Sequence, residues 1–191
     1  MRLPLHWLLA LPLFLPACKS MHSDDADQSL ILLGGEISPG PPGWHNSNPA
    51  GAGQVAFTFR GHGSSTGAEI GMQLGFGNTQ EAGLDRSFSI GEVFIGPFKE
   101  WQFGSRVSLL AGAGLRYAEA ETDVAGLYAD RRVDGDDSTG VYAHVGLYFR
   151  VTQAMSLGAD VRWADGWNYH IEGASHDARL TQILYGLRFG F

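Results

Sequence analysis

Two groups of residues carry side chains that could do chemistry. Near the C-terminus, His170, Ser175, His176 and Asp177 combine imidazole, hydroxyl and carboxylate groups, from which a nucleophile and its base can be assembled. Farther upstream, Asp134-Gly135-Asp136-Asp137 offers oxygen atoms that a hard cation prefers, but it lacks the spacing and the distal Glu of an EF-hand loop. We interpret both groups as solvated loop residues, and we expect neither a metal ion nor another cofactor.

A third set of ionisable residues recurs at alternate positions of otherwise apolar segments. His144 and Arg150, for example, alternate with Val145 and Leu147. A period of two places successive side chains on opposite faces of a β-strand. We therefore expect one face to carry a polar network, whose charged members are Arg60, Glu69, Arg106, Arg116, His144, Arg150, Asp160, Arg162 and Arg188.

The charged face needs internal partners, because burying a guanidinium without a counter-charge is costly. Glu36 is expected to supply one further carboxylate. Glu92 poses a problem, because Phe88, Ile90 and Phe94 are assigned to the apolar face and would carry it with them. We expect either a β-bulge that turns Glu92 inward or an incorrect assignment of the faces of this strand.

Alternation predicts eight strands, each close to the roughly 9 to 11 residues that cross a bilayer at a tilt. They lie near Ser29 to Ile37, Gly53 to Arg60, Gly67 to Gly77, Asp85 to Gly96, Ser105 to Ala118, Gly140 to Val151, Ser156 to Asp165 and Ala178 to Phe191. In the first strand, Leu30 to Leu33 are all apolar, so the pattern does not say which of these side chains point inward.

Composition narrows the class of protein. The chain has 27 Gly in 191 residues and only 17% charged residues, which indicates many turns and few helix-forming stretches. Its net charge of −7, without a Lys/Arg cluster, excludes nucleic acid as an expected partner. Cys18 is the single cysteine, so an intramolecular disulfide is impossible.

The C-terminal segment, Arg179 to Phe191, resembles the closing strand of bacterial outer-membrane β-barrels. Ile183, Tyr185 and Leu187 share one face with the terminal aromatic residue, whereas Gly and Arg share the other. The resemblance implies that Phe191 belongs to a signal read by the barrel insertion machinery. It also implies an all-β fold, an eight-stranded antiparallel up-and-down transmembrane β-barrel over residues 29–191, similar to the OmpA transmembrane domain and OmpX.

The connections predict a topology. Short links near Gly61 to Thr66, Pro97 to Gly104 and Thr152 to Met155 alternate with longer links, as periplasmic turns alternate with outward loops in such barrels. Both termini are then periplasmic. Aromatic girdles are expected from Trp163, Trp167 and Tyr169 at the outward rim, and from Phe98, Trp101, Phe103, Phe149 and Phe191 at the periplasmic rim.

The N-terminus predicts export. Residues 1–17 form a secretion signal, because the apolar run after Arg2 is too short and too rich in Pro to span a membrane. Leu15-Pro16-Ala17-Cys18 resembles a lipobox, although Pro16 departs from the usual pattern. The resemblance implies lipid attachment at Cys18, with residues 18–28 as a periplasmic polar linker. Ordinary cleavage nearby is the alternative.

These expectations favour a structural or surface-interaction protein of the Gram-negative outer membrane. Its partners would be membrane lipids, lipopolysaccharide and an extracellular ligand, and its lumen would be closed. A narrow porin-like channel and a lipid A-modifying enzyme are alternatives. The lipid A deacylase family carries His-x-Ser on its seventh strand, where this chain has Arg162-Trp163-Ala164-Asp165, so we expect no enzyme activity. A lipocalin-like barrel, with its apolar face inside, is the alternative fold.

Overall fold

The computed structural model describes residues 28–39, 50–81, 84–125, 131–134, 138–171 and 174–191. The predicted signal, Cys18 and most of the polar linker therefore lie outside the described residues. The strands are β1 (Gln28–Pro39), β2 (Ala50–Arg60), β3 (Thr66–Glu81), β4 (Leu84–Phe103), β5 (Val107–Ala125), β6 (Arg131–Asp134), β7 (Ser138–Arg150), β8 (Met155–Ile171) and β9 (Ala174–Gly190).

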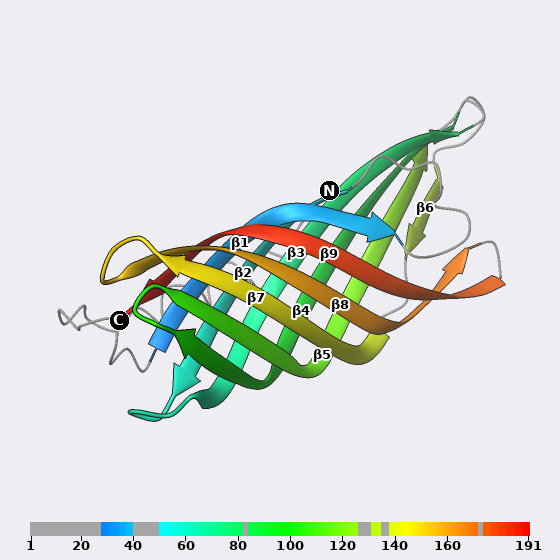
Figure 1. The fold of residues 1–191 in the computed structure, drawn as a ribbon. Helices are drawn as coiled ribbons and strands as arrows, with labels where there is room; N and C mark the ends of the chain where they lie inside the picture. Colours follow the sequence, from blue (N-terminus) through cyan, green and yellow to red (C-terminus); the bar gives the residue numbers. More distant parts are fainter. Residues whose placement is uncertain (1–27, 40–49, 82–83, 126–130, 135–137, 172–173) are drawn as a thin grey trace.

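Eight of these strands close into a barrel (Figure 1). Each pairs antiparallel with its neighbour in the chain, β5 pairs with β7, and β9 returns to pair with β1. The remaining strand, β6, is not part of the barrel wall. It pairs only with Glu121 to Val124, near the C-terminal end of β5. The predicted all-β fold, an eight-stranded antiparallel up-and-down barrel, is confirmed. None of the described residues belongs to a helix long and apolar enough to cross a bilayer.

The two ends of the barrel differ in their connections. At one end β2 and β3 are joined by residues 61–65, β4 and β5 by residues 104–106, and β7 and β8 by residues 151–154. Gly63 and Gly104 turn the chain there with φ values of 70° and 67°, which an L side chain rarely adopts. The amide of Phe191 donates to the carbonyl of Gln28 at 3.1 Å, so both ends of the described barrel also lie here. We call this the short-turn end and the opposite one the loop end.

The strands extend farther toward the loop end than the sequence pattern predicts. β3 and β4 pair as far as Glu81 and Leu84, and β8 and β9 as far as Ile171 and Ala174. Alternation of apolar and polar residues ends in β3, where Asn78 to Glu81 are all polar, but it continues in β8, where Trp167, Tyr169 and Ile171 alternate with Asn168 and His170. A register shift between Ala164 and Trp167 marks where the last hairpin departs from the regular wall.

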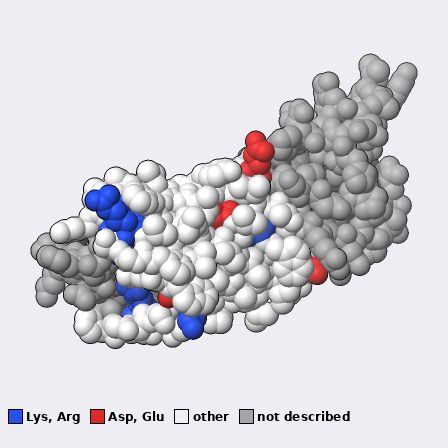
Figure 2. Space-filling model, in the orientation of Figure 1, with Lys and Arg blue, Asp and Glu red and all other residues white. Residues whose placement is uncertain are grey.

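The two faces of the wall are sorted by polarity. Leu115, Tyr185 and Ile95 are outward and 61%, 60% and 57% exposed, whereas the inward Arg116 and Arg162 are 2% and 1% exposed. In Figure 2, most of the described surface between the two ends belongs to uncharged residues. A water-soluble barrel sorts its faces the opposite way, so the lipocalin-like alternative is wrong.

The facing of β1 and β4 corrects the sequence analysis. In β1, Ile31 and Leu33 are buried inside, while Glu36 is exposed on the outer face and supplies no internal counter-charge. In β4, the register runs unbroken past Glu92, which pairs with Gln73 on one side and Ala118 on the other. The expected bulge is therefore absent from this part of β4, and the second expectation, incorrectly assigned faces, holds.

The corrected facing of β4 puts three large apolar residues inside. Ile90, Phe94 and Phe98 are buried with relative exposures of 2–3%, so Phe98 is not part of a rim girdle. Trp101 and Phe103 stay outward near the short-turn end, at 38% and 57% exposure. The interior is thus a mixture of charged, polar and apolar side chains.

Candidate functional site

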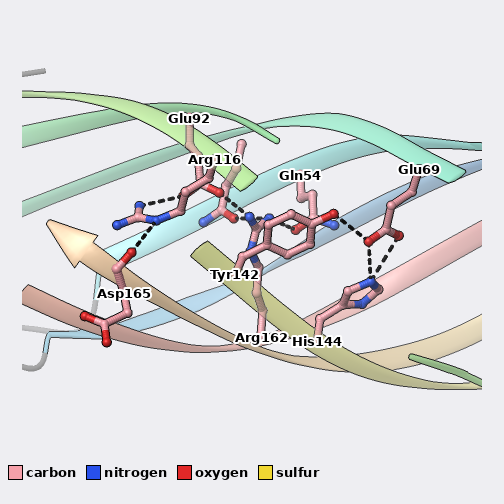
Figure 3. Close-up of polar contacts among 9 residues, drawn as sticks. Gln54, Glu69, Glu92, Arg116, Tyr142, His144, Arg162 and Asp165 are labelled. Carbon is pink, nitrogen blue, oxygen red and sulfur yellow. Dashed lines mark hydrogen bonds and ion pairs between the residues drawn. The ribbon is translucent and has the colours of Figure 1, made fainter. Parts of the chain in front are cut away.

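The inward polar residues form three clusters along the barrel axis, and these are the candidate site. The upper cluster, nearest the loop end, is centred on Glu92, the middle cluster on His144 and the lower cluster, nearest the short-turn end, on Glu100. Figure 3 shows residues of the upper and middle clusters projecting from different strands toward the same axis.

In the upper cluster, one carboxylate serves two guanidinium groups. Glu92 accepts a hydrogen bond from Nη1 of Arg116 at 3.1 Å through Oε2, and one from Nη2 of Arg162 through Oε1. All three side chains are at most 1% exposed. The Nε of Arg116 donates to the backbone carbonyl of Asp165 at 3.1 Å (Figure 3). Two cations from β5 and β8 are thereby bound to one anion from β4.

The second half of the Arg162 guanidinium is held by amides and aromatic rings. Its Nη1 donates to the side-chain oxygens of Gln54 at 3.0 Å and Gln73 at 3.2 Å. Its central carbon lies 4.1 Å from the ring centre of Phe94 and 4.7 Å from that of Tyr142, within the range of cation–π attraction. Arg162 thus connects β2, β3, β4 and β7 from its position on β8.

The middle cluster places a histidine between two carboxylates. Nδ1 of His144 lies 2.7 Å from Oδ2 of Asp160, and Nε2 lies 3.0 Å from both oxygens of Glu69. The hydroxyl of Tyr142 donates to Oε1 of Glu69 at 2.8 Å. Carboxylates on both ring nitrogens favour an imidazolium, because only that form donates from both nitrogens.

The lower cluster is built on Glu100, a residue that sequence analysis placed in a turn. Arg188 forms a two-pronged bond to it, with Nη1 to Oε1 at 2.7 Å and Nη2 to Oε2 at 2.9 Å. Nη1 of Arg60 reaches Oε2 at 3.2 Å. The Nε of Arg188 donates to Ser29, whose hydroxyl shares a hydrogen bond of 2.5 Å with Thr58. Glu100 could have been found by extending the alternation of β4 past Gly96, because Phe98 and Glu100 then fall on the same inward face.

Glycines make room for these groups. A Cβ added at Gly112 would overlap Oε1 of Glu69 and the ring of His144, and one added at Gly146 would lie 2.6 Å from the ring of Tyr148. An eight-stranded barrel has a lumen only just wide enough to be filled by side chains. The absence of side chains at these positions therefore allows long polar groups to meet across the axis.

Two of the predicted network residues lie apart from the three clusters. Arg106 is exposed in the turn between β4 and β5 and does not join the buried network, which corrects the prediction. Arg150, the last residue of β7, is half-buried at the short-turn end. Phe191 follows β9 at the same end and is also half-buried.

The candidate catalytic residues lie in the extended last hairpin and not in a loop. In the register of β8 and β9, His170 pairs with Ser175, and Tyr169 with His176. Asp177 pairs with Asn168 in the same ladder. Within the described residues, no group of three His, Cys, Asp or Glu side chains is placed to hold a metal ion. Residues 135–137 of the acidic segment lie outside the described residues.

Comparisons with known proteins show the fold. Neisserial surface protein A is similar over 87% of this chain and 98% of its own, with a TM-score of 0.63 and 14% identity. The attachment invasion locus protein Ail of Yersinia pestis is similar over 87% of this chain and 99% of its own, with a TM-score of 0.60 and 13% identity. The outer membrane protein OprG of Pseudomonas aeruginosa is similar over 87% of this chain and 97% of its own, with a TM-score of 0.54 and 10% identity. No family model and no curated protein sequence matches.

The bridge through Glu92 predicts a large loss of stability in Glu92→Gln. The variant leaves Arg116 and Arg162 buried without their carboxylate, so its free energy of unfolding should fall by roughly 3 kcal/mol or more. Glu36→Gln removes the same charge from an exposed site and should cost less than about 0.5 kcal/mol. Urea unfolding in detergent micelles measures both, and equal small losses would contradict the proposed importance of the bridge.

Proposed function

We propose that this protein is a structural and surface-interaction barrel of the Gram-negative outer membrane, with a closed lumen. One observation carries the proposal: large apolar side chains are exposed around the wall, while charged side chains are buried inside. Val145, Leu147 and Val161 are 49%, 56% and 51% exposed, like their counterparts on the other strands. In water such a surface would drive aggregation, whereas hydrocarbon is a suitable solvent for it.

Residues near the short-turn end suit a membrane interface. Trp101 is outward there, and Nζ of Lys99 lies 5.2 Å from the centre of its ring. Phe103 and Phe149 are exposed at the same end, at 57% and 48%. Aromatic rings and lysine are preferred at the level of lipid headgroups, where an apolar body and a polar tip are both solvated.

The orientation that we propose places the short-turn end in the periplasm. Barrels of this class have short periplasmic turns and longer extracellular connections, and both ends of the described barrel lie with the short turns. A lipid on Cys18 would then enter the inner leaflet through the polar linker of residues 18–28. Phe191 would complete the strand that the insertion machinery reads.

A surface ligand of this protein would differ from that of Ail. One structure of Ail, similar to this chain with a TM-score of 0.56, is described as a complex with the heparin analogue sucrose octasulfate, a polyanion. Here the segment from 119 to 137, which runs from the last part of β5 to β7, contains Glu119, Glu121, Asp123, Asp130, Asp134, Asp136 and Asp137 against Arg131 and Arg132. Because an acidic surface repels a polyanion, we infer that a ligand at the loop end is neutral or cationic.

A closed lumen is favoured over a conducting pore by the clusters across the axis. Pairs between strands that are not neighbours cross the lumen at three levels: Arg162 with Glu92, His144 with Glu69 and Arg188 with Glu100. Phe94 and Tyr142 add their rings to the upper level. A channel would need these bonds to open. A lipid A-modifying activity is the weaker alternative, because its candidate residues are held in the last hairpin and lack the His-x-Ser pattern.

A closed lumen predicts the absence of a steady conductance. Folded protein inserted into planar lipid bilayers should give no stable ohmic step, because ion pairs and rings block the axis at three levels. A mock preparation from cells without the gene is the control for contaminating porins. A reproducible ohmic conductance above that control would reject the closed-lumen proposal and favour the pore.

The barrel and its lipid anchor can be tested separately in membrane-extracted protein. Unboiled protein should migrate differently from boiled protein on a detergent gel, and metabolic labelling with palmitate should mark it. Cys18→Ser should lose the label and keep the heat-dependent shift. Identical migration before and after boiling would contradict the membrane barrel. A label that is absent from the unaltered protein, or that persists in Cys18→Ser, would contradict attachment at Cys18.

A further inference from the structure

A groove lies on the outer face of the wall over β1, β2 and β3, which are neighbours in the barrel (Figure 1). Its volume is about 460 Å³, and its lining is mostly apolar. The outward residues that line it are Leu32, Gly53, Val55, Met72, Leu74 and Phe76. The groove is therefore separate from the three clusters, whose side chains lie inside the lumen.

The groove is deep because two paired strands carry no side chain there. Gly34 of β1 pairs with Gly53 of β2, and both are exposed, as is Gly51. A Cβ added at Gly51 or Gly53 would meet no atom within 4 Å. Gly112 and Gly146 make room for lumenal side chains, but these outward glycines serve no such need. Glycine inside a strand weakens it and often marks a place where a ligand or another backbone approaches closely.

The groove occupies the loop-end half of the apolar wall. Counted from the short-turn end, the outward residues of β2 are Phe59, Phe57, Val55, Gly53 and Gly51, and the groove includes Val55 and Gly53. Beyond Gly34, the next outward residue of β1 is Glu36, which is exposed. A carboxylate on a lipid-facing wall costs least at the level of the polar headgroups. Glu36 thus marks that level, and the groove runs from it into the hydrocarbon.

A fatty-acyl chain fits the groove better than a second copy of the protein does. Lipid tails are as apolar as leucine, so van der Waals packing against the wall selects an occupant inside a membrane. The volume of about 460 Å³ holds roughly 15 groups of about 30 Å³, the size of a water molecule and close to that of a methylene. Two copies related by a twofold axis would set concavity against concavity and bring two Glu36 carboxylates to the same rim.

We propose that this groove binds one acyl chain of the lipid A part of lipopolysaccharide, and that Gly34 and Gly53 are the positions that admit it. The chain lies against the backbone of β1 and β2, with Leu74 and Phe76 along its side. The proposal rests on the orientation given under the proposed function, which puts the loop end outside. Lipopolysaccharide forms the outer leaflet of the Gram-negative outer membrane, so its acyl chains surround this half of the wall.

Native mass spectrometry of the folded, full-length protein in a maltoside detergent, with increasing amounts of lipid A, tests the groove. One lipid A should bind saturably. Gly53→Leu should weaken binding about tenfold, because the new side chain fills the space over the backbone. Ala143→Leu adds similar bulk to the outer face of β7, across the barrel, and should leave binding unchanged. The heat-dependent gel shift verifies that each variant is folded.

The same measurement decides between the proposed occupant and three others. Lipid A binding that appears only in Cys18→Ser would overturn the proposal, since the protein's own lipid would then fill the groove. Dipalmitoylphosphatidylethanolamine that binds as tightly as lipid A would overturn it in favour of phospholipid. Dimers that Gly53→Leu abolishes would overturn it in favour of a second copy.

Photo-crosslinking in intact cells separates failure of the groove from failure of the proposed orientation. p-Benzoylphenylalanine in place of Phe76 should form an adduct with lipid A, and in place of Phe149, which is exposed at the short-turn end, an adduct with phospholipid. Exchanged adducts would overturn the orientation and the groove assignment together. The expected adducts, combined with unchanged lipid A binding by Gly53→Leu, would overturn the groove alone.

Discussion

The bridge from Arg116 through Glu92 to Arg162 is the interaction on which the rest of the interior depends. Charges buried inside a barrel with an apolar outer wall have no bulk water around them, so each needs a counter-charge or a hydrogen bond within the molecule. Glu92 meets this need for two guanidinium groups at once. Glu92 also explains which side chains of β4 point inward. Turning this carboxylate outward would place a charge on the apolar outer face of the wall, beside Val93 and Ile95. Ile90 and Phe94 follow it inward, and Phe94 then lies against Arg162.

The small lumen explains why charged residues alternate with glycine. Tyrosine and histidine side chains fit into the lumen where a neighbouring position of the wall contributes no side chain, as at Gly112 beside His144 and at Gly146 beside Tyr148. The same geometry separates the interior into three levels. Each level has its own carboxylate: Glu92 in the upper cluster, Glu69 with Asp160 in the middle cluster and Glu100 in the lower cluster.

Much of the barrel follows from the sequence, because period-two alternation is unambiguous wherever one face is apolar and the other polar. β2, β3, β5, β7 and β8 have the predicted faces, and Glu69, Arg116, His144, Asp160 and Arg162 meet inside. Prediction failed where both faces are apolar or both polar. In β4, phenylalanine and isoleucine on both faces hid the true facing, and Glu100 was lost with it. Arg106 has the parity of an inward residue but lies in a turn. Alternation also gave no measure of how far the hairpins extend at the loop end.

A spin-label scan along β7 tests the central claim most directly, because the claim concerns which face of the wall meets hydrocarbon. Single cysteines from Val141 to Phe149, in a Cys18→Ser background, are labelled in protein folded into lipid vesicles. Collision with dissolved oxygen, which concentrates in hydrocarbon, should rise and fall with a period of two. We expect high values at Val141, Val145, Leu147 and Phe149, and low values at Tyr142, His144 and Tyr148. The opposite phase, or higher accessibility to a water-soluble relaxation agent at Val145 and Leu147, would contradict the account.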